Sequence, residues 1–268
     1  MAVFNRQKFG IIGTMDDIKR KVRQQFAQSA ESYVTSSIHA QGFDLPKLVE
    51  FAELQGTERV LDVGTATGHT ALTFAPHAAE VIGIDLTPDM LEIARQQAQL
   101  KKASNVIFMT ADADQLPFED RSFDRVTCRL CAHHFPGLSR PLAEMYRVLK
   151  PGGILLVVDN VAPEDDALDE WVNRVEKLRD PSHVREYRVS QWLDALEQAG
   201  FEAEAVLHFT TPLQIDTWTK QSRTPGDIIK QIKQHLDEAD ADQKRTFEIR
   251  TGQTYAFSVH KAVFRAKK

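Results

Sequence analysis

An apolar run that ends in a carboxylate and then in a cluster of small residues constrains this chain more than any other stretch. It spans Val60 to Thr70, with Asp62 closing the run and Gly64 and Gly68 following it. A helical pattern begins directly afterwards, so this order predicts a buried strand, a tight turn and a helix. Because glycine permits positive φ angles and a close approach to the backbone, we expect a ligand at this turn, at the carboxyl edge of a parallel sheet.

Two familiar phosphate-binding turns fit this stretch poorly. A P-loop needs Lys and then Ser or Thr after its last glycine, where this chain has His69 and Thr70. A dinucleotide-binding turn of the Gly-x-Gly-x-x-Gly type needs glycine where Ala66 and His69 stand. Asp62 would repel a pyrophosphate, whereas it suits a positive amino group. The residues therefore favour a nucleotide-like ligand with a cationic end over a purely structural turn.

Strand-like and helix-like segments alternate from residue 58 to residue 159. Such alternation predicts an α/β fold with a doubly wound, mostly parallel sheet and right-handed connections. The run from Ala143 to Gly153 is expected to be a helix that Pro151, Gly152 and Gly153 close. The seven expected strands lie at about 58–63, 80–85, 106–110, 123–130, 154–159, 203–210 and 255–264.

A second carboxylate ends the strand that follows the glycine turn. Asp85 lies about 20 residues beyond that turn, where a parallel-sheet nucleotide site places an acid for the ribose hydroxyls. A carboxylate fits this role because it accepts hydrogen bonds from both hydroxyls. A solvated strand end is the alternative, but two strand-ending acids in register favour the binding role.

These residues together resemble the motifs of a known enzyme class. Asp62, Gly64 and Gly68, the strand-ending Asp85, and the run from Arg147 to Gly153 resemble class I S-adenosylmethionine-dependent methyltransferases. The similarity covers about residues 26–265. Within this class, the chain is similar to the ubiquinone/menaquinone-biosynthesis family (methyltransferase type 11), and most of all to an uncharacterised bacterial subgroup of it that acts on small molecules. It implies a Rossmann-like, seven-stranded sheet with an antiparallel last strand, S-adenosyl-L-methionine as cofactor, and in-line methyl transfer to a small-molecule acceptor.

The resemblance also implies how the cofactor is held. Asp112 would bind the adenine amine with Ala113 alongside the ring, whereas Asp114 would point away into solvent. The helical pattern at 18–39, with Phe26 and Tyr33, resembles the family's entry helix that folds over the cofactor; an ordinary amphipathic helix is the alternative. The residues expected to contact the cofactor are Tyr33, Asp62, Gly64, Thr65, Ala66, Gly68, Asp85, Leu86, Met90, Asp112, Ala113 and Arg129.

Two histidines after the fourth strand are the candidate catalytic residues. Methyl transfer needs a base only where the acceptor atom must lose a proton, and neutral imidazole is a good base near pH 7. His133 and His134 stand where the methyl group should point, with a positioning or packing role as the alternative. Adjacent side chains face different ways, so at most one should reach the methyl. Weaker candidates for the acceptor pocket are Asp159, His183, Arg185 and Tyr187.

The segment with these histidines also bears on the acceptor and on metals. The family's quinone methyltransferases carry an Asn-rich segment here, so a quinone acceptor is not favoured. Cys128 and Cys131 form a C-x-x-C pair, which with the histidines could be a zinc or redox site. Because the pair closes an apolar strand and no second pair exists, we expect buried thiols and no metal. The arsenite methyltransferases, which are similar in fold, need at least three cysteines, whereas this chain has two.

Composition narrows the remaining classes. The chain has 268 residues, a net charge of −5 and 42% hydrophobic residues, which suits a globular protein with a full core. The absence of a basic patch, of a long apolar run and of a signal-peptide core predicts a cytoplasmic protein with neither nucleic-acid nor membrane partners. A monomer or homodimer is expected.

The expected organisation is an N-terminal arm and lid helix at 1–40, followed by an S-adenosylmethionine-binding domain at 41–268. Insertions at 160–190 and 215–253 are expected to help cover the site. The alternative functions are an NAD(P)-binding oxidoreductase, which Asp62, Ala66 and His69 disfavour, and a non-catalytic cofactor-binding protein.

Overall fold

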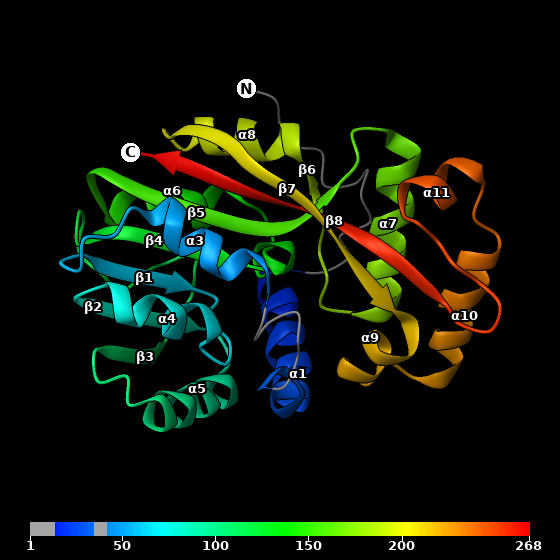
Figure 1. The fold of residues 1–268 in the computed structure, drawn as a ribbon, viewed down its shortest axis with the longest axis horizontal. Coiled ribbons are helices and arrows are strands. Elements are labelled where there is room, and N and C mark those ends of the chain that lie inside the picture. Colours follow the sequence, from blue (N-terminus) through cyan, green and yellow to red (C-terminus); the bar gives the residue numbers. More distant parts are fainter. Residues whose placement is uncertain (1–13, 35–41) are drawn as a thin grey trace.

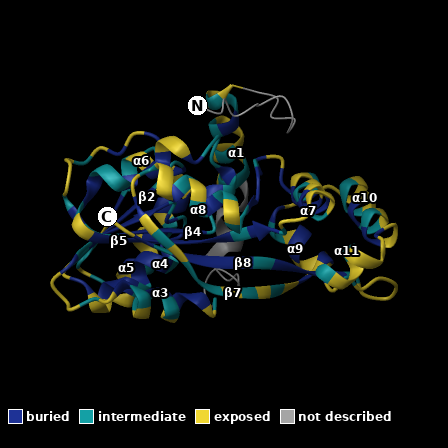
Figure 2. Ribbon diagram, turned by 90° about the horizontal axis from the view of Figure 1, so that it is seen from above, coloured by how far each residue is buried: buried dark blue, intermediate teal, exposed yellow. Residues whose placement is uncertain are grey.

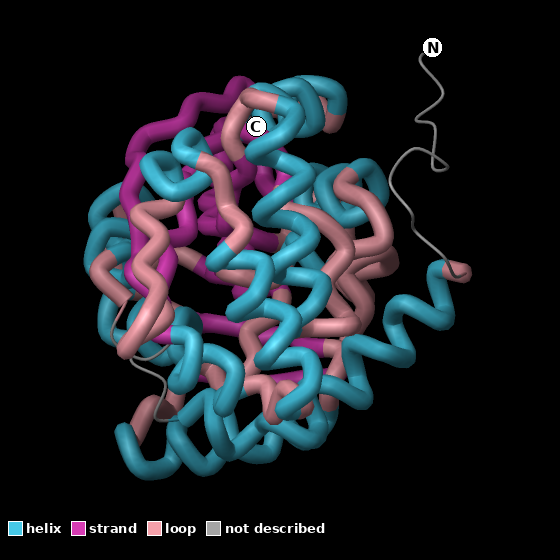
Figure 3. The backbone as a smooth tube through the Cα atoms, turned by 90° about the vertical axis from the view of Figure 1, so that its right-hand side faces the viewer, coloured by secondary structure: helices cyan, strands magenta, loops and turns pink. Residues whose placement is uncertain are grey.

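The structure is a computed structural model that describes residues 14–34 and 42–268, and for residues 28–34 the backbone alone is described. One twisted sheet lies between layers of helices (Figures 1 and 3). Its strands are β1 (Arg59–Val63), β2 (Glu80–Asp85), β3 (Val106–Thr110), β4 (Phe123–Arg129), β5 (Leu149–Ala162), β6 (Tyr187–Arg188), β7 (Glu202–Gln214) and β8 (Ala256–Lys267).

The helices follow the expected alternation with the strands. The α-helices are α1 (Met15–Val34), α3 (Asp44–Ala52), α4 (His69–Phe74), α5 (Pro88–Lys101), α6 (Ser139–Val148), α7 (Asp166–Arg179), α8 (Val189–Gln198), α9 (Ile215–Gln221), α10 (Gly226–Asp237) and α11 (Ala241–Thr246). Short 3-10 turns are η2 (Ala75–His77) and η3 (Ala132–His134).

The sheet confirms the predicted topology. Its order is β3-β2-β1-β4-β5-β8-β7, and the two-residue β6 pairs with β5 off this path. Strands β1 to β5 pair in parallel, whereas β8 runs antiparallel to both β5 and β7. The last strand is therefore the antiparallel one. The strand order reverses between β1 and β4, and a parallel sheet opens a ligand crevice at such a point.

Alternating strand residues build two cores, one on each face of the sheet. Leu61 and Val63 of β1 face the layer that contains α6 and α8, where Trp192 is buried. Val60 faces the opposite layer of α3, α4 and α5. This period of two within each strand, with buried residues on both faces, is what a doubly covered sheet requires. Figure 2 shows the buried strands between more exposed helices.

The expected helix stop at Pro151 to Gly153 is wrong. Helix α6 already ends at Val148, and the Pro-Gly-Gly segment lies inside β5, which begins at Leu149. The Gly152 N–H donates to the Lys268 carbonyl at 2.8 Å, and the Lys268 N–H donates to the Gly153 carbonyl at 3.0 Å. The register of β4 against β5 shifts at the same place. Pairing with the end of the chain therefore keeps this segment in the sheet as a bulge.

Strands β7 and β8 extend beyond the parallel sheet into a second lobe, which Figure 1 shows beside α7, α9, α10 and α11. Both strands are longer than the sequence predicted. The lobe has its own buried cluster, which includes Trp171, Ile215, Trp218, Phe247 and Phe257. These segments correspond to the expected insertions at 160–190 and 215–253.

The N-terminal helix α1 lies against α5 and α9, between the sheet and the second lobe (Figure 1). It begins at Met15, three residues earlier than predicted, because Thr14 and Asp17 cap it reciprocally. The Asp17 N–H donates to Thr14 Oγ1 and the Thr14 N–H donates to Asp17 Oδ2, each at 3.2 Å. The helix ends at Val34, and residues 35–39 of the predicted helix lie outside the described residues.

Candidate active site

A cavity opens at the carboxyl ends of β1, β2 and β4, where the strand order reverses. It encloses about 1470 Å³ of empty space, which includes its open mouth. The glycine turn forms one part of its wall, α1 covers it with Lys19, Val22 and Phe26, and the second lobe contributes Leu213 and Trp218. The cavity therefore lies between the sheet, α1 and the second lobe.

The turn after β1 needs glycine at Gly64. Its φ is +71°, and a Cβ atom built there would lie 2.1 Å from the Sγ atom of Cys131. Ala66 also takes a left-handed conformation, with φ of +46°, although it is not glycine. Its N–H donates to the Asp85 carboxylate at 2.9 Å, which offsets part of the strain. The backbone of this turn is thus held in the cavity wall by its neighbours.

Asp62 lies behind the turn. Its carboxylate accepts hydrogen bonds from Thr65 Oγ1 at 2.6 Å, Thr127 Oγ1 at 2.7 Å and the Ala71 N–H at 3.2 Å. It is 1% exposed, and burial raises its pKa to about 6 even though these hydrogen bonds oppose the shift. Asp62 therefore joins the turn, α4 and β4, while its predicted contact with a cationic ligand end stays a prediction.

Asp85 stands at the end of β2, in the cavity wall. Its carboxylate accepts the Ala66 N–H at 2.9 Å and the Thr87 N–H at 2.8 Å. Burial raises the pKa of Asp85, and the hydrogen bonds from Thr87 and Ala66 oppose this. Two backbone donors hold the carboxylate at the mouth of the turn, and its remaining lone pairs are available to hydroxyl groups.

The expectation that Asp114 is solvated is wrong. Its side chain is 6% exposed and lies 2.5 Å from the ammonium of Lys19, which also binds Asp112 at 2.7 Å. The Asp114 N–H in turn donates to Asp112 Oδ1 at 3.0 Å. The tight turn after β3 curls Asp114 back beneath α1 instead of outward. Lys19 therefore ties α1 to the predicted adenine-binding segment, a contact that the helical pattern alone could not reveal.

The two candidate histidines differ sharply in their surroundings. His133 places Nδ1 at 2.5 Å from Asp159 Oδ1, and its backbone N–H donates to Asp159 Oδ2 at 2.9 Å. Burial disfavours its imidazolium, but the Asp159 carboxylate outweighs this, and the net pKa of His133 is raised above 6.5. Burial and the neighbouring His133 lower the pKa of His134 to about 4. Both side chains line the cavity, so the expectation that adjacent residues face apart is too simple.

The ring of His134 packs against helix α1 and the loop that contains Ser182. Its ring meets Phe26 of α1 edge-on at 4.9 Å between centroids, and its Nδ1 lies 3.2 Å from Ser182 Oγ. The 3-10 turn η3 explains why both rings reach the cavity. In such a turn successive side chains are rotated by about a third of a turn, whereas in a strand they point to opposite faces.

Most of the predicted cofactor residues line the cavity, although this does not test their contact with a cofactor. Asp62, Gly68 and Met90 lie outside the wall: Met90 is fully buried, and a Cβ at Gly68 would lie 2.8 Å from Phe108. The side chain of Tyr33 lies outside the described residues. Those in the wall are Gly64, Thr65, Ala66, Asp85, Leu86, Asp112, Ala113 and Arg129.

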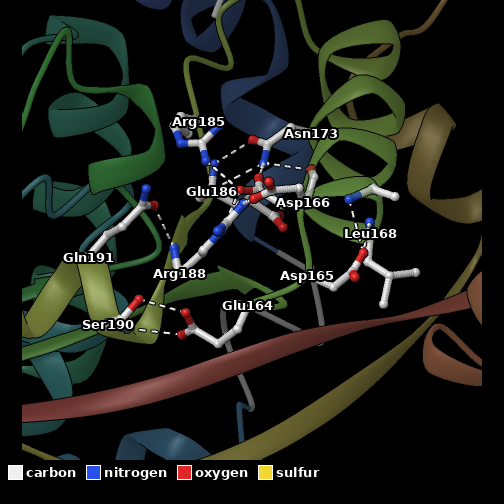
Figure 4. Close-up of polar contacts among 12 residues, drawn as sticks. Glu164, Asp165, Asp166, Leu168, Asn173, Arg185, Glu186, Arg188, Ser190 and Gln191 are labelled. Carbon is white, nitrogen blue, oxygen red and sulfur yellow. Dashed lines mark hydrogen bonds and ion pairs between the residues drawn. The ribbon is translucent and has the colours of Figure 1, made fainter. Parts of the chain in front are cut away.

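The loop predicted to line the acceptor pocket instead supports the pocket from behind. Among the four weaker candidates, Asp159 holds His133, and His183 Nε2 lies 3.1 Å from Asn173 Oδ1. Asp169 of α7 binds Arg185 at 2.6 Å and Arg188 at 2.7 Å. Figure 4 shows the polar contacts that tie this loop to α7 and α8. Tyr187 is buried in β6 among core residues.

Several residues of the cavity wall were not predicted from the sequence. They are Lys19, Asn160, Glu176, Arg179, Trp218 and Lys261, which come from α1, β5, α7, α9 and β8. Lys261 gave a detectable signal, because it directly follows the polar His260 and so breaks the alternation of apolar and polar residues in this strand. Lys19, Glu176 and Arg179 lie on amphipathic helices, where a charged residue is the usual solvent-facing choice, so they gave no signal.

The two cysteines are free thiols on either side of the end of β4. Cys128 is buried in the strand, and Cys131 lies in the cavity wall against Gly64. Hydrogen bonding to Cys128 and burial raise the pKa of the Cys131 thiol well above its usual value. Within residues 14–27 and 42–268, no group of three or more His, Cys, Asp or Glu side chains is arranged to hold a metal ion.

Comparison with known proteins bears directly on this cavity. A family model described as "Methyltransferase domain" matches residues 61–157. The chain is 43% identical to the uncharacterized methyltransferase YcgJ of Bacillus subtilis, over 85% of this chain and 90% of that protein. The chain belongs to the S-adenosylmethionine-dependent methyltransferases. The YcgJ crystal structure superposes on this methyltransferase with a TM-score of 0.82 at 41% identity, covering 84% of this chain and 97% of that one.

A more distant relative is the demethylmenaquinone methyltransferase of Deinococcus radiodurans. It is 37% identical over 57% of this methyltransferase and 65% of its own length. As a member of this family, this chain uses S-adenosylmethionine as methyl donor. The chain's own residues fit that cofactor, because the Gly64 turn excludes a Cβ and Asp85 presents a carboxylate to the cavity.

In the described part of the chain, no helix has the length and apolar character needed to cross a membrane.

Proposed function

We propose that this methyltransferase transfers a methyl group to a small-molecule acceptor in the cavity, with His133 as the general base where the acceptor atom carries a proton. The observation that carries this proposal is the pair of His133 and Asp159 at the cavity wall. Because Nδ1 faces the carboxylate, Nε2 is the nitrogen left to take a proton. What the bound S-adenosylmethionine supplies is a methyl group on a sulfonium, already activated for in-line displacement by the acceptor.

The residues that hold the cofactor are proposed to be those of the turn and the next two strand ends. Asp85 accepts hydrogen bonds from the ribose hydroxyls, and Asp112 with Ala113 takes the adenine end. Thr65 and Ala66 present the backbone of the turn. Their places in one wall support this set, and the hydrogen bonds to Asp85 and Asp112 fix both carboxylates before a ligand arrives.

Asp159 acts through His133 as a positioning residue. The Asp159 side chain is 1% exposed. Its carboxylate is hydrogen-bonded to the backbone N–H groups of His133 and Asn160 and to the imidazole Nδ1 of His133. Such a carboxylate fixes the tautomer of the neutral imidazole and stabilises the imidazolium that forms when the proton arrives. His134, with its low pKa, stays neutral and packs against Phe26.

Helix α1 and the second lobe are proposed to act as the cover of this cavity. Lys19 and Phe26 of α1 lie in its wall, and Gln25 Nε2 donates to the Ser222 carbonyl of the second lobe at 3.1 Å. The cover would exclude water while two ligands are bound. The division into a lid helix at 1–40 and a domain at 41–268 is part of this proposal.

The proposal is tested in two steps that separate cofactor binding from chemistry. Calorimetry should show binding of S-adenosylmethionine and none of NADH. A metabolite library incubated with the enzyme and S-adenosylmethionine should then yield a product heavier by one methyl group in mass spectrometry. Binding of NADH with comparable affinity would contradict the cofactor assignment, and binding of S-adenosylmethionine without transfer to any library member would favour a non-catalytic binding protein.

A further inference from the structure

A second part of the cavity wall comes from β5, α7 and β8, outside the glycine turn. Asn160, Glu176, Arg179 and Lys261 line it, and none has a role in the cofactor site described above. Lys261 of β8 lies directly opposite Asn160 of β5 in their antiparallel pairing, so both side chains leave the sheet on one face. Four polar groups thus gather in one region of the cavity.

Lys261 carries a buried ammonium without a partner. The residue is 5% exposed, and among residues 14–27 and 42–268 no ion pair or hydrogen bond engages its Nζ atom. Burial lowers its pKa to about 8, which leaves it mostly protonated at neutral pH. A buried, unpaired charge is costly, so its presence in a ligand cavity points to a ligand that pairs with it.

Arg179 adds a second cation. Its Nε atom is buried and has no hydrogen-bond partner in the described part of the chain, and its guanidinium carbon lies 5.0 Å from the ring centroid of Trp218. A guanidinium held on an aromatic face presents its N–H groups sideways, in the arrangement that carboxylates and phosphates accept.

The nearby carboxylates do not neutralise this region. Asp44 and Asp159 act on Lys261 from a distance, but Asp44 is bound to Arg129 and Asp159 to His133. Glu176 is the carboxylate in the wall itself, and burial raises its pKa. Asp180 adjoins Arg179; burial raises the pKa of Asp180, but the charges of His134 and Arg179 outweigh this, and its carboxylate is already bound by Ser182. Among the described residues neither Lys261 nor Arg179 forms an ion pair, so both cations can still pair with an incoming anion.

We propose that the methyl acceptor is a small organic anion whose carboxylate or phosphate group pairs with Lys261 and Arg179. Its apolar body packs against Trp218 and the neighbouring Leu213 and Val259, which line the same cavity. The Oδ1 atom of Asn160 is buried without a partner among the described residues and accepts a hydrogen bond from a hydroxyl or amino group of the acceptor. This inference rests on the proposed function, because it places the acceptor in the same cavity.

Binding of charged and uncharged probes to the full chain tests this inference. Benzoate and phenyl phosphate are compared with uncharged benzamide by calorimetry, with S-adenosylhomocysteine bound. The wild type should prefer the anions, and Lys261→Met should lose that preference by about ten- to hundredfold, the range for hydrogen bonds to charged groups. Lys261→Arg should keep most of it. Lys233→Met is the matched control, since Lys233 of α10 lies outside the cavity wall and pairs with the exposed Asp216 at 3.0 Å.

The outcomes separate this inference from the proposed function. Equal binding of benzoate, phenyl phosphate and benzamide to the wild type would overturn the inference, as would an unchanged preference in Lys261→Met. Failure of S-adenosylhomocysteine to bind would instead count against the proposed function. Should Lys261→Met fail to fold, Arg179→Gln makes the same test. The stronger of the two anions identifies the carboxylate or the phosphate as the acceptor group.

Discussion

The imidazole Nδ1 atom of His133 lies 2.5 Å from one carboxylate oxygen of Asp159, and the other oxygen accepts the His133 backbone N–H at 2.9 Å. One buried carboxylate therefore fixes both the backbone and the ring of the residue that we propose as the base. Because burial alone would lower the pKa of this imidazole, its raised pKa depends on Asp159.

We predict that Asp159→Asn lowers the pKa of His133. The substitution leaves the burial that lowers this pKa and removes the Asp159 charge that raises it, so the titration midpoint of His133 should fall. NMR titration of the imidazole in both proteins measures this without any acceptor. His77, an exposed histidine outside the cavity wall, is the internal reference. A His133 midpoint that stays in place would show that Asp159 does not govern its protonation.

Lys19→Met should loosen α1. The variant leaves the buried Asp114 carboxylate without its ammonium, and we expect the free energy of unfolding to fall by about 1–3 kcal/mol. Backbone hydrogen exchange in α1 should become faster. Arg20→Met is the control, because Arg20 is exposed and reaches Asp17 at only 3.4 Å. Equal exchange rates in wild type and Lys19→Met would refute the role given to this contact.

Gly64→Ala should destabilise the fold far more than Gly152→Ala. Both glycines have positive φ angles, +71° and +76°, but a Cβ at Gly64 meets Cys131 Sγ at 2.1 Å, whereas nothing lies within 4 Å at Gly152. We expect Gly152→Ala to cost about 1 kcal/mol from backbone strain and Gly64→Ala about 3 kcal/mol or more. Chemical denaturation measures both. Equal losses would mean that the turn can move away from Cys131.

Asp85→Ala should weaken cofactor binding by about 1.5–3 kcal/mol, the range for hydrogen bonds to a charged group. The reason is that the carboxylate lies in the cavity wall at the end of β2. Calorimetry with S-adenosylmethionine measures the loss. Glu80→Ala, at the other end of β2, is the control. An unchanged affinity in a folded Asp85→Ala protein would remove the ribose assignment.

The periodic parts of the fold could be predicted from the sequence because they obey local rules. Residues 58–159 alternate apolar strands with amphipathic helices, and that pattern allows few arrangements besides a parallel sheet. The glycine turn could also be predicted from the sequence, since Gly64 and Gly68 both adopt the positive φ angles that glycine permits. The helix stop predicted at Pro151 to Gly153 was wrong because the residue that keeps this segment in the sheet, Lys268, lies over a hundred residues away in the sequence.

The site was harder to predict where distant segments meet. Asp114 looked like a solvated residue until Lys19, which is 95 residues away, covered it. Lys261 and Arg179 belong to β8 and α7, and they line the same cavity although they are far apart in the sequence. Such contacts depend on tertiary packing, which no local pattern encodes.

The pH dependence of methyl transfer in His133→Ala and His134→Ala tests the central claim most directly, using an acceptor found by library screening. Our account predicts that His133→Ala lowers turnover about 100-fold or more and loses the acid limb of the profile between pH 5.5 and 8.5, with cofactor affinity within a few-fold of wild type. His134→Ala should keep that limb. An acid limb retained in His133→Ala would contradict the account, because the proton would then leave the acceptor without this imidazole.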